Sequence, residues 1–170
     1  MRKEIYKALV DRLLLHLKMV DGEPMVLPTE ADAVEHDDCE SVIKHVDLWN
    51  HNVEFIEEDE VWARPAVFIE FAPIKWQPMK GRADYTEYTT RSRLMLHVVT
   101  DWKGSASAGS PFVDESLETF DLMNAIHTLL QDFSGPGFDH LDLVESQTNH
   151  NHEAIVENVE IYEYRGTKWL

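Results

Sequence analysis

The chain has 170 residues, a mass of 19.7 kDa and a formal net charge of −17, from 32 acidic and 15 basic residues. Its 44% hydrophobic residues suffice for a packed core, and its length fits a single domain, which we place over residues 1–170. Tight binding of nucleic acid depends on Lys and Arg that displace counterions, so this acidic charge argues against tight DNA or RNA binding.

Residues 2–20 carry apolar side chains at the four-residue spacing of an amphipathic helix: Ile5, Leu9, Leu13 and Leu17. Charged and polar residues interrupt this segment, so it lacks the roughly 20 apolar residues of a membrane span. It also has no small-residue cleavage site of a secretory signal. We predict a helix over 2–20, ended by the Gly and Pro of residues 21–24, in a cytosolic protein with no membrane partner.

Residues 29–40 are strongly acidic and lack apolar periodicity, which predicts a solvated loop that could also be partly helical. Residues 41–49 and 53–58 are rich in β-branched and aromatic residues on either side of a turn at 50–52. We predict a β-hairpin here, so that residues 29–58 form an acidic loop and hairpin insertion within the domain.

The remaining segments predict strands and a second helix. Strands are expected at 64–74 and 89–102, separated by a loop or hairpin arm at 76–87. The strand at 89–102 is apolar on both faces near its centre, which indicates a central strand covered on both sides. Residues 140–146 and 154–164 alternate and predict an antiparallel pair.

The second helix is expected to begin at Asp114 as N-cap and to end at the Ser-Gly-Pro-Gly of residues 134–137. The side chains that follow its 3.6-residue period are Leu117, Phe120, Met123, Ile126, Leu130 and Phe133. The resulting fold class is α+β, with an antiparallel or mixed β-sheet packed against two main α-helices and an additional β-hairpin.

Cys39 is the single cysteine, so the chain can form neither an internal disulfide nor a cysteine zinc cage. Its neighbours in Glu-His-Asp-Asp-Cys-Glu are carboxylates that would raise the pKa of the thiol and suppress the reactive thiolate. We therefore do not assign Cys39 a catalytic role.

His150 and His152 are two residues apart beside Glu153, and in a strand both rings would point to one face and could share a metal ion. A third ligand would have to come from His97 or His140. The competing interpretation, which we favour because no known zinc signature is present, is a polar turn of Asn and His between two strands. We predict His97 to be a hydrogen-bonded core or interface histidine, and His127 has no metal-site context.

The sequence contains no nucleophile elbow, no phosphate-binding loop and no dinucleotide fingerprint, so we predict neither an enzyme nor a cofactor. Trp, Tyr and Arg near the ends of predicted elements instead suggest a subunit interface, because these residues are enriched in interface centres. The candidate interface residues are Trp62, Tyr85, Tyr88, Arg91, Arg93 and Trp102.

The predicted elements follow one another in a fixed order. The order is a leading helix, the strand Pro-Ala-Val-Phe-Ile-Glu-Phe at 65–71, the long strand at 91–102, the helix at 114–130 and a closing strand pair. Over residues 2–165 this succession resembles the tail terminator, or neck, proteins of long-tailed bacteriophages. The resemblance implies an α+β subunit of a homo-oligomeric, hexameric ring that caps the tail tube and meets the head connector. It implies no catalytic residues and a location in the virion, after assembly in the bacterial cytoplasm.

An acidic ring lumen would keep DNA phosphates from sticking during passage, which agrees with the charge of this chain. Two other functions stay open from the residues alone. One is a metal-dependent enzyme that uses His150 and His152. The other is an adaptor or immunity-like module whose acidic face binds a basic partner.

Overall fold

The computed structural model describes residues 1–53, 62–79, 87–149 and 153–169. Within them the chain has an α+β fold, as predicted. The elements in chain order are α1 (Arg2–Leu15), β1 (Leu17–Val20), β2 (Glu23–Val26), α2 (Glu30–Glu35), β3 (His45–Leu48), β4 (Ala66–Phe71), β5 (Gln77–Met79), β6 (Glu87–Asp101), α3 (Val113–Leu130), β7 (Phe138–Asn149) and β8 (Ile155–Trp169).

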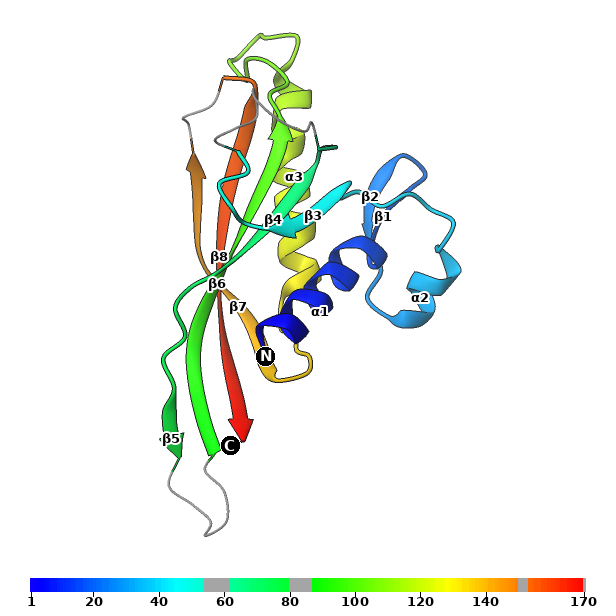
Figure 1. Ribbon diagram of the computed structural model, residues 1–170. Helices are drawn as coiled ribbons and strands as arrows, with labels where there is room; N and C mark the ends of the chain where they lie inside the picture. Colours follow the sequence, from blue (N-terminus) through cyan, green and yellow to red (C-terminus); the bar gives the residue numbers. More distant parts are fainter. Residues whose placement is uncertain (54–61, 80–86, 150–152, 170) are drawn as a thin grey trace.

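Six strands form one mixed sheet in the spatial order β3-β4-β6-β8-β7, and β5 pairs with β6 beside this path. The β3–β4 pair is parallel, and the other pairs of this sheet are antiparallel. β6 and β8 pair along their full length, from Glu87 opposite Trp169 to Asp101 opposite Ile155. They form the spine of the molecule, and α1 and α3 lie on the same side of it (Figure 1).

The main core lies between this sheet face and the two helices. On β6 the alternate residues Leu94, Leu96 and Val98 point into it, and α1 contributes its predicted stripe of Ile5, Leu9 and Leu13. The opposite sheet face carries a smaller core, whose buried members are Val53, Ala66, Phe68, Val99 and Ile155. The prediction that both faces of the central strand are covered is therefore confirmed for the C-terminal half of β6.

The predicted helix over 2–20 was too long, because α1 ends at Leu15 and residues 17–20 form β1. β1 and β2 are joined by Asp21 and Gly22, which have positive φ angles of 52° and 84°. An Asp-Gly pair with positive φ at both positions is the preferred two-residue hairpin turn. Asp21 and Gly22 therefore reverse the chain into a hairpin, which forms a separate two-stranded sheet.

The hairpin predicted over 41–58 is described only in its first arm and its turn. Its first arm forms β3, and on one edge β3 pairs in parallel with β4, with His45 opposite Ala66. The second arm beyond Val53 lies outside the described residues. Residues 29–40 contain the short helix α2, whose Thr29 and Asp32 form a capping box in which each side chain accepts a hydrogen bond from the other residue's backbone N–H.

The second predicted helix forms α3, but its N-cap is Phe112 instead of Asp114, and it ends at Leu130, before Phe133. Its core-facing residues are Leu122, Met123, Ile126, Leu129 and Leu130. Leu117 and Phe120 were expected on this face and are exposed instead. An ideal helix advances 100° per residue, so both residues lie on the side opposite the Leu122–Ile126 stripe. The two closing strands pair antiparallel as predicted, and β7 extends to Asn149.

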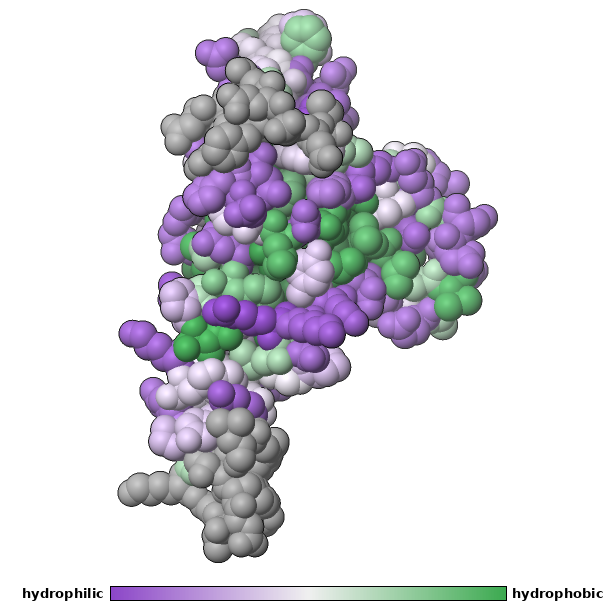
Figure 2. Space-filling view, viewed as in Figure 1, coloured by the Kyte–Doolittle hydropathy of each residue, from purple (hydrophilic) through white to green (hydrophobic). Residues whose placement is uncertain are grey.

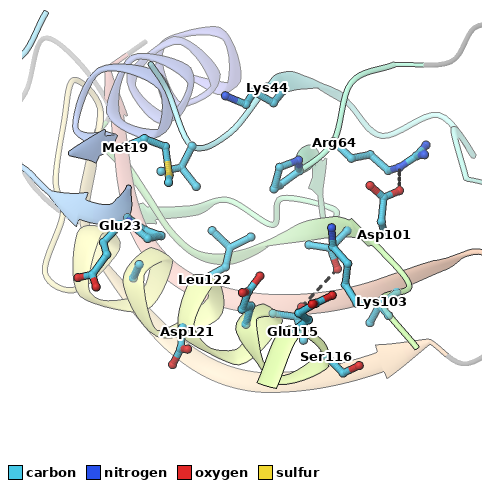
Figure 3. A pocket seen from close by; sticks show the side chains of 18 of the residues that line it. Met19, Glu23, Lys44, Arg64, Asp101, Lys103, Glu115, Ser116, Asp121 and Leu122 are labelled. Carbon is cyan, nitrogen blue, oxygen red and sulfur yellow. Dashed lines mark hydrogen bonds and ion pairs between the residues drawn. The ribbon is translucent and has the colours of Figure 1, made fainter. Parts of the chain in front are cut away.

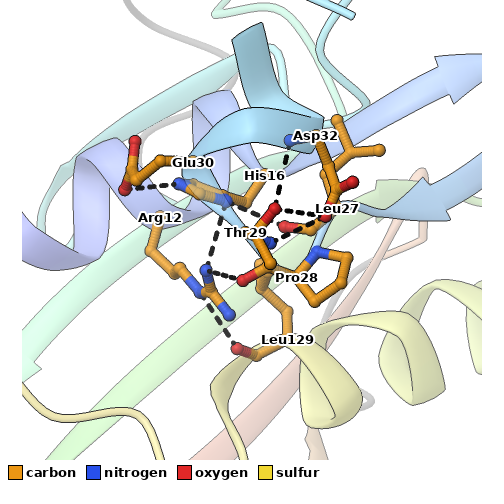
Figure 4. A network of polar contacts seen from close by, with 8 residues as sticks. All are labelled: Arg12, His16, Leu27, Pro28, Thr29, Glu30, Asp32 and Leu129. Carbon is orange, nitrogen blue, oxygen red and sulfur yellow. Dashed lines mark hydrogen bonds and ion pairs between the residues drawn. The ribbon is translucent and has the colours of Figure 1, made fainter. Parts of the chain in front are cut away.

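A polar network fastens α1 to its neighbours near the C-terminal end of that helix (Figure 4). The Arg12 guanidinium donates to the carbonyl oxygens of Leu129 in α3, at 3.2 Å, and of Pro28, at 3.3 Å. The His16 ring donates from Nδ1 to the Leu27 carbonyl oxygen at 2.8 Å. Backbone carbonyls at the end of α3 and after β2 thus gain partners from α1, which fixes how these elements pack.

β5 and the adjoining ends of β6 and β8 extend beyond both helices (Figure 1). We call the described part of this extension, residues 75–79, 87–89 and 167–169, the arm. In Figure 2, apolar side chains gather between α1 and β3, whereas the arm shows residues of intermediate hydropathy. Within the described residues, no helix is long and apolar enough to cross a membrane.

Candidate functional site

The six candidate interface residues do not form one patch. Tyr88, Arg91 and Arg93 lie in the N-terminal half of β6, whereas Trp102 follows the C-terminal end of this strand. β6 has fifteen residues, which at about 3.3 Å per residue separates its two ends by about 45 Å. Trp62 precedes β4 and packs beside the smaller core, and Tyr85 lies outside the described residues.

Arg91 and Arg93 both pair with Glu163, which faces them from β8. Glu163 accepts a hydrogen bond from Arg91 Nε and lies 3.6 Å from Arg93 Nε. Both guanidiniums are exposed, and one carboxylate offsets two positive charges. Exposed ion pairs contribute at most about 1 kcal/mol to stability, so these pairs add little to the fold. Asp132, Asp139 and Asp142 line the same surface as Arg91, so it carries charges of both signs.

The arm itself presents a cation among aromatic rings. Lys168 Nζ lies 4.5 Å from the centre of the Trp76 ring and 5.6 Å from that of Tyr88. Pro78 and Met79 of β5 and the preceding Lys75 are exposed. The arm therefore combines exposed apolar surface with two lysines, and it projects beyond the core that holds the rest of the sheet.

Trp62 has a structural role in the single chain. Its ring packs edge-on against Phe68, with 4.9 Å between the ring centres, and Arg64 lies 5.7 Å from the centre of its face. Trp102, by contrast, is 53% exposed. The structure thus keeps Trp102 as a surface residue and places Trp62 against the smaller core.

The outward face of α3 is an apolar surface that the sequence reasoning assigned to the core. Leu117 is 43% exposed, Phe120 is 55% exposed, and the neighbouring Phe112 is 48% exposed. Neither Leu117 nor Phe120 belongs to either buried cluster. The sequence did hold a clue to this exposure. The apolar residues of this segment cover more of the helix circumference than the single stripe that a helix packed on a sheet can bury.

A groove of about 910 Å³ lies on the other side of α3 (Figure 3). Its walls are the β1–β2 hairpin, residues 40–44, Arg64 and Pro65, the C-terminal end of β6 with the two residues after it, residues 115–125 of α3, and Val156 of β8. The apolar part of the lining includes Met19, Val42, Leu122 and Ala125. The groove is therefore bounded by six segments that only the tertiary fold brings together.

The groove is acidic. Six carboxylates and three cationic side chains line it, and the carboxylates are Glu23, Glu40, Asp101, Glu115, Glu118 and Asp121. Lys44 pairs with Glu40 and Arg64 pairs with Asp101, both at 2.5 Å. The other four carboxylates form no ion pair with any described residue. Figure 3 shows Glu23, Glu115 and Asp121 along one side and Lys44 and Arg64 along the other.

The sequence matches no protein-family model and no curated protein. The function therefore has to be inferred from the side chains that form the surfaces and polar clusters.

His97 forms a buried polar cluster on the face of β6 that points away from the helices. Its Nδ1 is 2.7 Å from Glu157 Oε1, and its Nε2 is 3.0 Å from Glu70 Oε2. The Trp49 ring stacks on it with 3.8 Å between ring centres and 3° between ring planes. His97 is thus the hydrogen-bonded core histidine that the sequence predicted, and both of its nitrogens are engaged by carboxylates.

A second cluster joins α3 to β7 and β8. His127 Nε2 lies 2.9 Å from Glu160 Oε2, and the hydroxyl of Ser146 donates to the same oxygen. Glu160 is buried and stands between the serine and the histidine. An activated serine needs a base that accepts its proton and a third group that orients that base. Here Glu160 accepts from both side chains, and the histidine does not contact the serine as a base. The cluster therefore links α3, β7 and β8.

The proposed metal pair His150 and His152 lies outside the described residues. Within the described ranges, no group of three or more His, Cys, Asp or Glu is arranged to hold a metal ion. Of the suggested third ligands, His97 already faces two carboxylates, and His140 is exposed on β7 beside Asp139.

The Cys39 thiol has a raised pKa, as the sequence predicted. Desolvation is the largest cause, followed by the negative charge of Asp38. A raised pKa keeps the thiol protonated at neutral pH, and the protonated form is a poor nucleophile.

Proposed function

We propose that this chain is a structural subunit that assembles with copies of itself into a ring at the head–tail junction of a long-tailed bacteriophage. In this role it caps the tail tube and meets the head connector, and it makes or breaks no covalent bond. The resemblance in element order over residues 2–165 suggests the location, and the exposed surfaces of the fold support assembly.

The observation that carries the proposal is the apolar outward face of α3. Leu117, Phe120 and Phe112 are each more than two-fifths exposed, on the side of the molecule away from the core. Burying such side chains is worth about 1.5–3 kcal/mol each, and large exposed apolar groups that lie together mark interaction sites. A neighbouring subunit would remove them from water.

The acidic charge supports the same role in a second way. At −17 per subunit, a ring would present many carboxylates, and its lumen would repel the phosphates of DNA that passes through it. The protein would then guide a genome without retaining it.

The test is the mass of the purified protein over a concentration series, measured by light scattering after size exclusion and by sedimentation. We expect a multiple of the 19.7 kDa chain, with six chains as the size implied by the resemblance, and ring-shaped particles in electron micrographs. Leu117→Asp with Phe120→Asp should shift the protein towards monomer. Met25→Asp with Val34→Asp, at two exposed apolar residues outside this helix, is the matched control.

A wild-type protein that stays monomeric at every concentration would contradict self-assembly. The metal-enzyme alternative is tested by elemental analysis of the same preparation. One bound transition metal per chain, lost together with stability on chelation, would favour His150 and His152 as ligands and replace the structural proposal.

A further inference from the structure

The groove and the arm lie at opposite ends of one rigid strand pair. Asp101 and Trp102 at the C-terminal end of β6 line the groove, whereas the arm contains residues 87–89 at the beginning of β6. With about 45 Å between these ends, the arm of a chain cannot reach the groove of the same chain. Any contact between the two surfaces must join different molecules.

The two surfaces are complementary in charge. Four carboxylates of the groove, Glu23, Glu115, Glu118 and Asp121, form no ion pair with a described residue. The arm offers Lys75, which is exposed, and Lys168, whose described partners are aromatic rings, against one acid, Glu87. The chain has about twice as many acidic as basic residues, so most of its surface repels an acidic groove. The two lysines of the arm would attract the groove.

The two surfaces are also complementary in apolar character. The arm exposes Pro78 and Met79, and the groove lining includes the partly exposed Met19 and the 53% exposed Trp102. Removing both from water adds an attraction that does not depend on salt. Unbranched methionine side chains on both surfaces can adapt to an imperfect fit.

We propose that the arm of one subunit docks in the α3 groove of a second copy, with Lys75 and Lys168 facing Glu115 and Glu118. This inference rests on the proposed self-assembly and specifies the contact. The docked surfaces differ, so the contact is head-to-tail. A repeated head-to-tail contact closes into a ring when its rotation allows and otherwise continues as a filament.

Cysteine cross-linking tests the contact directly. In a Cys39→Ser background, Met79→Cys places a thiol on the arm and Glu118→Cys places one on the groove. Under mild oxidation, the double variant should give a ladder of covalent multimers on a non-reducing gel, and reduction should collapse it. Either single variant can give at most a dimer. Met79→Cys combined with Glu35→Cys, on the exposed side of α2, is the matched control and should give no ladder.

Charge reversal provides an independent measurement. Glu115→Lys with Glu118→Lys should weaken self-association at least tenfold, measured by sedimentation. Adding Lys75→Glu and Lys168→Glu to the same chain should restore most of it. Glu35→Lys with Asp37→Lys changes the net charge equally and should leave association unchanged. Circular dichroism and thermal unfolding of each variant establish that it is folded.

The outcomes separate this contact from the proposed function. If wild-type protein forms oligomers but the double-cysteine variant gives no ladder, the arm–groove contact is wrong and the assembly role stands. If the reversal affects association no more than its control does, the contact is also wrong. If wild-type protein neither self-associates nor cross-links, both proposals fail.

Discussion

At the scale of single residues, the fold depends on buried polar groups whose partners come from distant parts of the chain. His97 and Glu157 are 60 positions apart, and Glu157 lies in the interior, where an unpaired carboxylate is costly. The stacked Trp49 and the engaged Glu70 complete the cluster. His97 thus joins β4, β6, β8 and the segment after β3.

Replacing His97 should be strongly destabilising. We expect His97→Ala to lower the free energy of unfolding by about 3 kcal/mol, because buried Glu157 loses one of its hydrogen-bond partners and Trp49 loses its stacking surface. His140→Asn is the control, since this histidine is exposed and Asn tolerates its positive φ of 24°; we expect a change within about 0.5 kcal/mol. Urea unfolding measures both, and equal effects would contradict the structural role of His97.

Tyr162 predicts how stability depends on alkaline pH. Its ring is fully buried, and its hydroxyl has no hydrogen-bond partner among the described residues. Burial, followed by the charge of Glu160, raises the pKa of Tyr162 well above its ordinary value of about 10. The resulting stabilisation is fully present below pH 10 and is lost above it, because the unfolded state then releases the proton first.

We therefore expect the melting temperature of the wild type to fall more steeply above pH 10 than that of Tyr162→Phe. At pH 7 this variant should be within about 1 kcal/mol of the wild type or more stable, because it removes a buried hydroxyl without a partner. Thermal unfolding monitored from pH 7 to 11 tests both statements. Parallel curves for the two proteins would show that Tyr162 does not cause the alkaline loss.

At the scale of elements, α3 has different neighbours on its three sides. One side packs on the sheet through Leu122, Ile126 and Leu130, the next borders the acidic groove, and the third exposes Leu117 and Phe120. The same helix therefore serves the core and two external surfaces. The two outer sides are not needed for the fold of the single chain, so they are free to contact another subunit in the proposed assembly.

The two apolar series of α3 should respond differently to truncation. Ile126→Ala removes a completely buried side chain, and we expect a loss of about 3 kcal/mol from the cavity that it leaves. Phe120→Ser should change the stability of the monomer by no more than about 0.5 kcal/mol, because its ring already contacts water. Urea unfolding at dilutions where the protein is monomeric gives the comparison. A large loss of monomer stability in Phe120→Ser would show that Phe120 contributes to the core.

At the scale of the whole molecule, an elongated strand pair separates a cationic, aromatic arm from an acidic groove. Opposite charges at opposite ends of a rigid body favour ordered head-to-tail contacts between copies. The overall charge of −17 favours solubility and limits non-specific contacts with other acidic molecules.

The charge also predicts the behaviour towards DNA. We expect no retardation of duplex DNA in a gel-shift assay at 50 mM salt, where non-specific electrostatic binding is strongest, even at high protein concentration. A basic protein of similar size is the positive control. Binding that weakens steeply with added salt would show that the Arg91 and Arg93 surface engages phosphates, contrary to this expectation.

Periodicity alone located most elements. The apolar residues of a buried helix or strand face recur at the period of that element, so the sequence shows them directly. Core residues found in this way are Leu9 and Leu13 in α1, Leu96 and Val98 in β6, and Ile126 in α3. The polar environment of His97 was also foreseeable, since a histidine between buried strand residues needs partners. The resemblance supplied a function but no contact, and the groove and arm were not recognised.

Sequence by itself determined the α+β class, the order of the main elements, the acidic charge and the burial of both faces in the C-terminal half of the central strand. Tertiary structure decided the pairing of β3, the exposure of Leu117 and Phe120, the partners of His97, and the assembly of the groove from six segments. The physical reason is range. Side-chain periodicity depends on neighbours a few positions away, whereas strand partners and surfaces depend on residues that meet only after the chain has folded.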